Sequence, residues 1–589
     1  MTDLPIEPQI DAERVSEDNR LDSWKEIAAF LKKDVRTVQR WEKVAGLPVR
    51  RYSQDKAGGV FAYKSEIDEW LRSQQGRPLP PGPAPGDEED EDSTETDDDD
   101  NRGNGWTQAW RYAALVILVA VLAVVAYRWF ARPAHKLKVM VRNLQTLSQG
   151  GADDAFSQGM TDELITDLGR ANPEQLGVLA RTTADLYSKK TISELRGLGV
   201  DYVIEGSVFR DRDEIRINTQ LIDTRDGTQL SAKSYEGASK SVLDLQRTAA
   251  DDIVVSLKLP LRTRPQPRQV IPPAYDAYVE GRFAWNQRGQ YSVANSINKF
   301  KKAVDLDPNF APAYAGLADA YALLASAQYG ILPPVEGFAE AKQFAERSIA
   351  LDPELAAPHA SLGYIYLVFE RNPESARKEF EKALQLDPNY TTAHQWYGQY
   401  YEVIGRLDDA VREIEKAHER EPASIPVNLA MAEVYYFKRD YDRAIGFALT
   451  TVRQENTSAL GHFNLGRAYE MKGLHNQAID EFKLARENAP NIATLVPLAY
   501  EYARAGDMTT STDYLNQLVD LAERQHKYVP AIYFTVAYTG RNDKENALTW
   551  LAKANQERCD YIVFLSRDPM VDPLRGDPRF EAIANLHNP

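Results

Sequence analysis

The chain has 589 residues, too many for one hydrophobic core, so we expect several folded units. Apolar residues at 43% and charged residues at 27% exclude a wholly disordered chain. The formal net charge of −17 argues against a protein that coats nucleic acid with its whole surface, and the single cysteine, Cys559, excludes an internal disulfide and a cysteine metal cluster.

The charge is unevenly distributed in the N-terminal part. Residues 1–20 are polar and acidic without an apolar run, which predicts a disordered N-terminus and no secretory signal. Residues 21–77 carry twelve Lys and Arg against eight Asp and Glu, a net of +4, whereas residues 87–100 carry eleven carboxylates in fourteen positions. Because the basic residues 21–77 are followed by an acidic run, we expect residues 21–77 to include a specialised N-terminal domain, which we call the head.

Residues 21–74 predict a small helical unit with a β-hairpin. Ser23-Trp24-Lys25-Glu26 is a capping-box pattern at the start of a first helix, and a second helix is expected over 35–44. Two short helices with a short turn, the second rich in Arg, Thr and Gln, are typical of a helix-turn-helix. Strand patterns at 49–52 and 60–63 predict the hairpin.

The segments SWKEIAAFLKKDVRTVQRWEKVAGLPVRR and GGVFAYKSEIDEWL resemble the winged helix-turn-helix of excisionase and MerR-type DNA-binding domains. This resemblance implies a second helix in the major groove and a hairpin over the phosphates. The alternative is a small protein-binding unit with solvated charges. The DNA-binding residues that the resemblance implies are Arg36, Thr37, Gln39, Arg40, Lys43, Arg50, Arg51 and Lys56.

Residues 75–105 are rich in proline and then in carboxylates, so they cannot bury a core, and we predict a disordered tether. The acidic run either keeps this tether extended or competes with DNA for the basic head. The apolar run 112–127 follows, with tryptophan and arginine at both ends, and it predicts a single transmembrane helix over 109–131. The alternative for this run is a buried core helix.

The orientation of that helix is ambiguous in the sequence. Lys and Arg are more numerous on its C-terminal flank, which by the positive-inside rule places the C-terminal side in the cytoplasm. A DNA-binding head requires the opposite, and long domains translocate despite flanking charge. We therefore expect a bacterial inner-membrane protein with a cytoplasmic N-terminus and periplasmic C-terminal domains. A wholly cytoplasmic chain with a peripheral apolar segment is the alternative.

Residues 136–259 mix short strand patterns with helical ones, which predicts a small α/β domain with a mixed sheet. The residues GMTDELITDLGR and LGVDYVIEGSVFRDRDEIRINTQLIDTRDGTQL resemble the TolB N-terminal-like domain. In bacterial envelope and signalling proteins, that domain often precedes tetratricopeptide arrays. The resemblance implies architecture and compartment more than mechanism.

Residues 274–589 have an internal period of thirty-four residues. Ala376, Ala410, Ala444 and Ala478 follow this period, as do Pro388, Pro422, Asn456 and Pro490. Small, large and proline positions at this spacing resemble tetratricopeptide (TPR) repeats, which implies seven or eight helix pairs in an all-α right-handed superhelix with a polar C-terminal cap. The concave groove that would bind a protein or peptide is expected to include Tyr364, Gln395, Gln399, Glu402, Leu429, Glu433, Tyr436, Phe463, Arg467 and Glu470.

No catalytic pattern is present in the sequence. The eight histidines are scattered, and no His-Glu-x-x-His, Gly-x-Ser-x-Gly or Walker motif occurs. We therefore predict that the protein is not an enzyme and needs neither a cofactor nor a metal. His359, His394 and His462 share one repeat position, where partial burial between helices is expected.

The predicted protein is multidomain: a winged head, one transmembrane helix, an α/β domain and a superhelical solenoid. Its expected function is that of a membrane-anchored DNA-binding transcriptional regulator with an extracytoplasmic sensor. The expected partners are DNA, the bilayer, a protein at the groove and, for palindromic operators, a second copy of the chain. The alternative is an envelope scaffold whose head does not regulate transcription.

Overall fold

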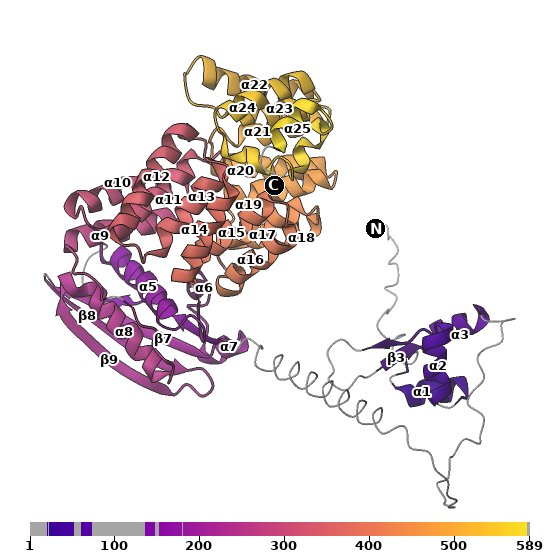
Figure 1. Cartoon of the computed structure of the whole chain (residues 1–589), viewed down its shortest axis with the longest axis horizontal. Coiled ribbons are helices and arrows are strands. Elements are labelled where there is room, and N and C mark those ends of the chain that lie inside the picture. The colour runs from indigo at the N-terminus through magenta and orange to yellow at the C-terminus, as the bar shows by residue number, and fades with distance from the viewer. Residues whose placement is uncertain are drawn as a thin grey trace, which may run out of the picture. The chain divides into compact units, whose positions relative to one another are not determined.

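The structure is a computed structural model with two compact units, residues 1–127 and 128–589 (Figure 1). The predicted membrane helix at 109–131 and the tether at 75–105 lie outside the described residues. Among the helices that are described, none is long and apolar enough to cross a membrane. The described residues are 20–21, 23–33, 35–51, 60–73, 136–147, 152–179, 181–211, 213–264 and 266–585.

The N-terminal unit contains the predicted helices and hairpin strands. Its elements are β1 (Arg20–Leu21), α1 (Trp24–Leu31), α2 (Val35–Ala45), β2 (Arg50–Arg51), β3 (Val60–Tyr63) and α3 (Lys64–Ser73). The Ser23 hydroxyl caps α1 by accepting a hydrogen bond from the Glu26 backbone N–H at 3.3 Å. Ile27, Val38 and Ile67 are fully buried between the helices and the sheet.

The three strands of this unit have the order β1-β3-β2, and both pairs are antiparallel. The β2–β3 pair forms the two sides of the predicted hairpin. Strand β1 was not predicted, because Arg20 was placed in a disordered N-terminus. That placement is wrong, since Arg20 pairs with Tyr63 of β3. Strand β1 thereby covers the edge of β3 that β2 leaves unpaired.

The second unit begins with a mixed sheet, which confirms the predicted small sheet domain. Its strand order is β6-β4-β7-β8-β9, with β5 paired to β7; β6, β4 and β7 are parallel, whereas β7, β8 and β9 are antiparallel. The strands are β4 (Leu137–Val141), β5 (Gln145–Thr146), β6 (Leu176–Leu179), β7 (Tyr202–Asp211), β8 (Glu214–Asp223) and β9 (Gln229–Ala238). The helices are α5 (Ala152–Ala171), α6 (Arg181–Leu186), α7 (Ile192–Gly197) and α8 (Val242–Ser256).

Eight helix pairs follow within residues 266–585 (Figure 1). They are α9 (Pro272–Asn286) and α10 (Gln290–Leu306), α11 (Ala311–Ala325) and α12 (Pro334–Leu351), α13 (Ala356–Val368) and α14 (Pro373–Leu386), α15 (Thr391–Val403) and α16 (Leu407–Arg420), α17 (Ile425–Phe437) and α18 (Tyr441–Gln454), α19 (Ala459–Met471) and α20 (His475–Asn488), α21 (Leu495–Arg504) and α22 (Met508–Glu523), and α23 (Ala531–Gly540) and α24 (Lys544–Gln556). The short helices η2 (Asp560–Phe564), η3 (Pro569–Leu574) and α25 (Pro578–Ala584) follow the last pair.

The small and large positions of the thirty-four-residue period pack against each other. A Cβ atom built on Gly363 would lie 2.7 Å from the ring of Phe380, and one on Gly466 would lie 2.5 Å from the ring of Phe482. Both rings are fully buried. These two helix pairs therefore close on a glycine, because a larger side chain would overlap the ring opposite it. This agrees with the small and large positions that the period predicts.

The sheet domain and the first repeats share one hydrophobic core, although the sequence predicted separate domains. Helix α5 approaches α9 so closely that a Cβ atom on Gly159 would lie 2.1 Å from Val279. The Tyr278 hydroxyl donates to Glu163 of α5 at 3.1 Å. Further along, the Asn389 side chain donates to the Gly169 carbonyl at 3.0 Å. The apolar stripe of α5 thus covers both the sheet and the repeats.

The loop between α11 and α12 joins the second repeat to the last one. The Ala327 backbone N–H donates to Asp560 at 2.8 Å, and the Ala327 carbonyl accepts from the Tyr533 hydroxyl at 2.5 Å. The Arg371 guanidinium also bonds the Asn555 side chain. The loop between α11 and α12 therefore has a structural role, because it connects the second helix pair to the last pair and to η2.

Candidate functional site

The predicted groove residues lie on α13, α15, α17 and α19, the first helices of four consecutive pairs. The chain's own C-terminal segment, residues 559–577, packs against these helices. Its Val563, Phe564 and Met570 belong to the same buried cluster as Tyr364 and Trp396. The interior of the array is thus filled from within the chain at these positions.

Asp568 anchors the C-terminal segment inside the array. Its side chain is 1% exposed and accepts hydrogen bonds from the Tyr436 hydroxyl at 3.0 Å and from the Tyr561 hydroxyl at 2.9 Å. It also caps η3 by accepting from the Met570 backbone N–H at 2.9 Å. One carboxylate therefore ties α17 to both short helices of the segment.

Further contacts hold the segment along its length. Phe564 stacks on Phe437 with ring centroids 6.1 Å apart. The Tyr500 hydroxyl donates to the Met570 carbonyl at 3.4 Å. At the surface, Arg439 forms two hydrogen bonds with Asp572, at 2.7 and 2.9 Å. Aromatic packing, buried hydrogen bonds and a bidentate ion pair thus act on the same nineteen-residue stretch.

Two carboxylates and one guanidinium lie in the filled interior. Glu402 is 1% exposed, and within the described residues neither of its carboxylate oxygens has a hydrogen-bond partner. Burial, with a further contribution from Glu433, raises the pKa of Glu402 well above its ordinary value. Arg467 lies 3.8 Å from Glu433 and 4.5 Å above the Tyr436 ring.

In this structure residues 559–577 of the chain itself pack into the predicted groove, and partner binding by its ten residues stays a prediction. The C-terminal tail was expected to be a polar cap, but its stretch CDYIVFLSRDPMVDPL buries Ile562, Leu565 and Val571. The runs of apolar residues in this stretch were the signal that sequence reasoning missed. Tyr364, Glu402, Tyr436, Arg467 and Glu470 are buried, whereas Gln395, Gln399, Leu429, Glu433 and Phe463 are half-buried.

The three histidines at the shared repeat position are buried more fully than expected. The Nδ1 atoms of His359, His394 and His462 each lie 2.6 Å from a glutamate of the second helix of the same pair. Burial tends to raise the pKa of Glu413, but hydrogen bonds from His394 and Lys416 offset this effect and hold it below its ordinary value. These pairs connect the two helices of a repeat.

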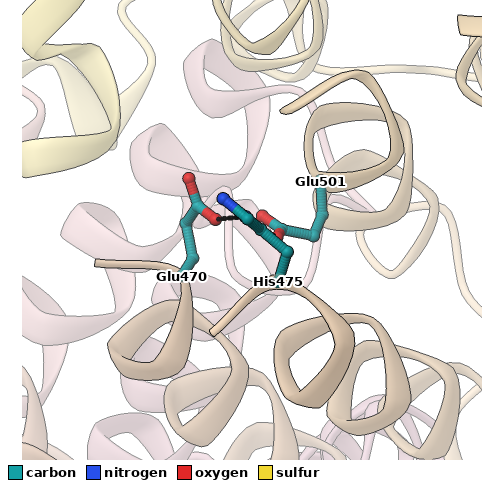
Figure 2. Close-up of side chains that lie close together, drawn as sticks. All are labelled: Glu470, His475 and Glu501. Carbon is teal, nitrogen blue, oxygen red and sulfur yellow. Dashed lines mark hydrogen bonds and ion pairs between the residues drawn. The ribbon is translucent and has the colours of Figure 1, made fainter. Parts of the chain in front are cut away.

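A different histidine lies in a carboxylate cluster (Figure 2). His475 Nδ1 is 2.8 Å from Glu470 Oε2 and 2.8 Å from Glu501 Oε1. Arg504 Nε donates to the other oxygen of Glu470 at 3.2 Å. Burial and the neighbouring Glu470 raise the pKa of Glu501 far above its ordinary value. Sequence reasoning missed the cluster because its members come from three helices without a local motif.

The structure of the N-terminal unit contradicts one of the predicted DNA contacts. Thr37 is only 3% exposed, so its side chain packs into the unit and does not reach a base edge. Gln39 is half-buried, and Arg50 is exposed, with Glu66 at 2.7 Å and the Tyr63 ring at 5.5 Å. The side chains of Arg36, Arg40, Lys43 and Arg51, and the whole of Lys56, lie outside the described residues.

Comparison with known families agrees with the repeat geometry. Residues 365–424 and 429–491 match the tetratricopeptide repeat family. This part of the chain is a TPR array. Among solved structures, the chain is similar to a human IFIT1 dimer with PPP-AAAA, at 17% identity over 54% of this chain and 78% of that one, with a TM-score of 0.36. It is also similar to pilF of Pseudomonas aeruginosa, at 20% identity over 35% of this chain and 93% of that one, with a TM-score of 0.27.

Two curated relatives match parts of the chain. A Rhizobium meliloti protein named as adenylate cyclase 3 is 32% identical over 191 residues, which is 31% of this chain and 32% of the relative. The transcriptional regulator HilA of Salmonella typhimurium is 23% identical over 297 residues, which is 50% of this chain and 53% of the relative. The chain therefore spans about a third and about half of the lengths of these two relatives.

Proposed function

We propose that the protein is a DNA-binding transcriptional regulator whose TPR array binds a protein partner. The observation that carries the proposal is the architecture of the N-terminal unit. Two short helices, α1 and α2, are followed by the β2–β3 hairpin strands, in the order that a winged helix-turn-helix requires. The similarity to HilA, a protein named as a transcriptional regulator, supports the same function.

The faces of α2 support its role as the recognition helix. Thr37, Val38 and Trp41 are buried and define the face that packs into the unit. With 3.6 residues per turn, positions 36, 40 and 43 lie on the opposite side of the helix backbone. These positions carry Arg36, Arg40 and Lys43, the residue types that contact guanine edges and phosphates.

Substitution of the basic residues on α2 tests DNA binding. We expect Arg36→Ala and Arg40→Ala each to weaken binding to a specific site by about 1–3 kcal/mol, because each removes a bidentate contact with a base. Arg51→Ala should weaken binding to all sequences equally, since a hairpin charge contacts phosphates. Arg72→Ala, on the exposed end of α3, is the matched control. Gel shifts at fixed salt measure the effect, and unchanged affinity in all three α2 and hairpin variants would contradict DNA binding.

We further propose that residues 109–131 anchor the protein in a bacterial inner membrane, with the head in the cytoplasm and the second unit in the periplasm. The apolar run with aromatic flanks supports the anchor, and the requirement of the head for DNA supports the orientation. A reporter enzyme that is active only in the periplasm, fused after Pro589, should be active. Activity of a cytoplasmic reporter at the same position would instead reverse the orientation.

The TPR array is the proposed site for the protein partner, and the head is proposed to dimerise on palindromic operators. A partner that binds inside the array has to replace the C-terminal segment, because that segment already contacts Tyr436 and Phe437. The alternative function is an envelope scaffold, in which the array binds its partner and the head does not bind DNA. Catalysis is not part of either proposal, since the sequence contains no recognised catalytic motif.

A further inference from the structure

The cluster of Glu470, His475 and Glu501 lies where three consecutive TPR helices meet (Figure 2). Glu470 is near the end of α19, His475 is the first residue of α20, and Glu501 is in α21. The two glutamate side chains are 1% and 0% exposed, whereas the histidine side chain is 35% exposed. The histidine therefore connects a buried carboxylate pair with solvent.

The surrounding protein atoms in the described part of the chain do not provide a hydrogen-bond donor for every oxygen of this carboxylate pair. Within the described residues, no donor reaches Glu501 Oε2, although this oxygen is fully buried. A single Nδ1–H of His475 faces two carboxylate oxygens, both at 2.8 Å, and can be directed at only one of them. An unpaired buried carboxylate oxygen is costly, and either a proton or a metal ion between the two glutamates would offset that cost.

We propose that Glu470, His475 and Glu501 bind one Zn²⁺ ion. Their ligand atoms all lie within 4.8 Å of one another. Zn²⁺ binds imidazole nitrogen and carboxylate oxygen in tetrahedral geometry at roughly 2.0–2.2 Å, so two of its ligand atoms lie roughly 3.3–3.6 Å apart. The two 2.8 Å separations from His475 Nδ1 would therefore widen by less than about 1 Å to admit the ion. Imidazole with two carboxylates suits Zn²⁺, whereas Mg²⁺ prefers oxygen ligands and retains its water.

The surrounding residues support ligand binding by this cluster. Arg504 donates to Glu470 Oε1, which leaves Oε2 directed at His475. The exposed edge of His475 provides a route for the ion from solvent. Zn²⁺ takes the place of protons here. The carboxyl proton of Glu501 leaves to solvent, and the ring proton of His475 moves by way of solvent from Nδ1 to Nε2, so that neutral imidazole binds the metal through Nδ1. The ion would connect three helices that belong to two repeats.

A proton is the competing occupant. If Glu501 is simply protonated, it can donate to Glu470, and the cluster needs no metal. Glu501→Gln separates the two cases, because an amide keeps the shape and a donor of the protonated acid but is a poor ligand for Zn²⁺. The variant is therefore expected to fold in either case.

The experiment is a Zn²⁺ titration of the EDTA-treated full chain against a chromophoric chelator. We expect the wild type to bind one tight equivalent of Zn²⁺ that His475→Ala and Glu501→Gln bind on the order of 100-fold more weakly or lose. His526→Ala, which removes an exposed loop histidine, is the control and should retain the tight equivalent. Weak binding by the carboxylates of residues 87–100 is common to all variants and cancels in the comparison.

Thermal unfolding gives a second readout. Zn²⁺ should raise the unfolding temperature of the wild type and of His526→Ala but not that of Glu501→Gln, whereas Mg²⁺ should raise none of them. Equal Zn²⁺ affinity in the wild type and in Glu501→Gln would overturn the proposal. So would a wild type that binds no tight equivalent, in which case the cluster holds a proton.

Discussion

Asp568→Ala should release the C-terminal segment from the interior of the TPR array. The substitution leaves the buried hydroxyl of Tyr436 and the partly buried hydroxyl of Tyr561 without this acceptor, and it removes the cap of η3. Because two hydroxyls lose their acceptor and a helix loses its cap, the local free energy of unfolding of this segment should fall by roughly 3–5 kcal/mol. Hydrogen exchange should show the backbone amides of residues 559–577 exchanging faster by two or more orders of magnitude, with the sheet domain unchanged.

The control for this substitution is Asp520→Ala, which removes a carboxylate paired with Arg524 on the surface of α22. Its effect on stability should lie within about 0.5 kcal/mol. If Asp568→Ala leaves exchange over 559–577 unchanged, the segment is not held by this carboxylate. If Asp568→Ala also retains more of a partner protein than the wild type does in a pull-down, the segment and the partner compete for one surface.

Phe380→Ala should be among the most destabilising single substitutions in the array. The ring is fully buried and fills the space beside Gly363, so its loss leaves a cavity and should cost about 3–5 kcal/mol. Gly363→Leu alone should also destabilise, because its Cβ atom would lie 2.7 Å from the ring. In the double variant the leucine enters the cavity, and part of the stability should return.

Urea unfolding of the wild type, the two single variants and the double variant measures this coupling. We expect an interaction energy of about 1–3 kcal/mol in the favourable direction. Tyr291→Ala, at an exposed side chain of α10, is the control and should change stability by less than about 0.5 kcal/mol. Strictly additive losses would mean that the two positions do not share one packing space.

The predictions that succeeded depend on local periodicity. The spacing of Gly363, Gly466 and the aligned prolines determines helix pairs, because each helix must bury one face against its neighbour. The alternating residues of β8, buried at Ile215, Ile217 and Leu221, predicted that strand and its partners in the same way. Such patterns need no information about distant parts of the chain.

The features that sequence reasoning missed depend on distant contacts. Tyr436 meets Asp568 across 132 positions of the chain, and His475 meets Glu501 across 26, so no period or motif relates them. Arg20 joins a sheet only because the edge of β3 is available. Thr37 lies next to Val38 at the boundary of the buried face of α2, where a polar residue type alone does not reveal which way its side chain faces.

The bond between Ala327 and Asp560 also has a consequence for how the molecule is assembled during synthesis. An open solenoid folds through nearest-neighbour contacts, so each helix pair can settle as soon as the ribosome has released the next one. Here the two partners are separated by 233 positions, and ring closure must await the final pair. Forming such a contact carries a large loop-closure entropy and slows folding. The early pairs therefore remain incompletely buried until Asp560 has been synthesised, and the segment around Asp560 determines when the array becomes cooperative.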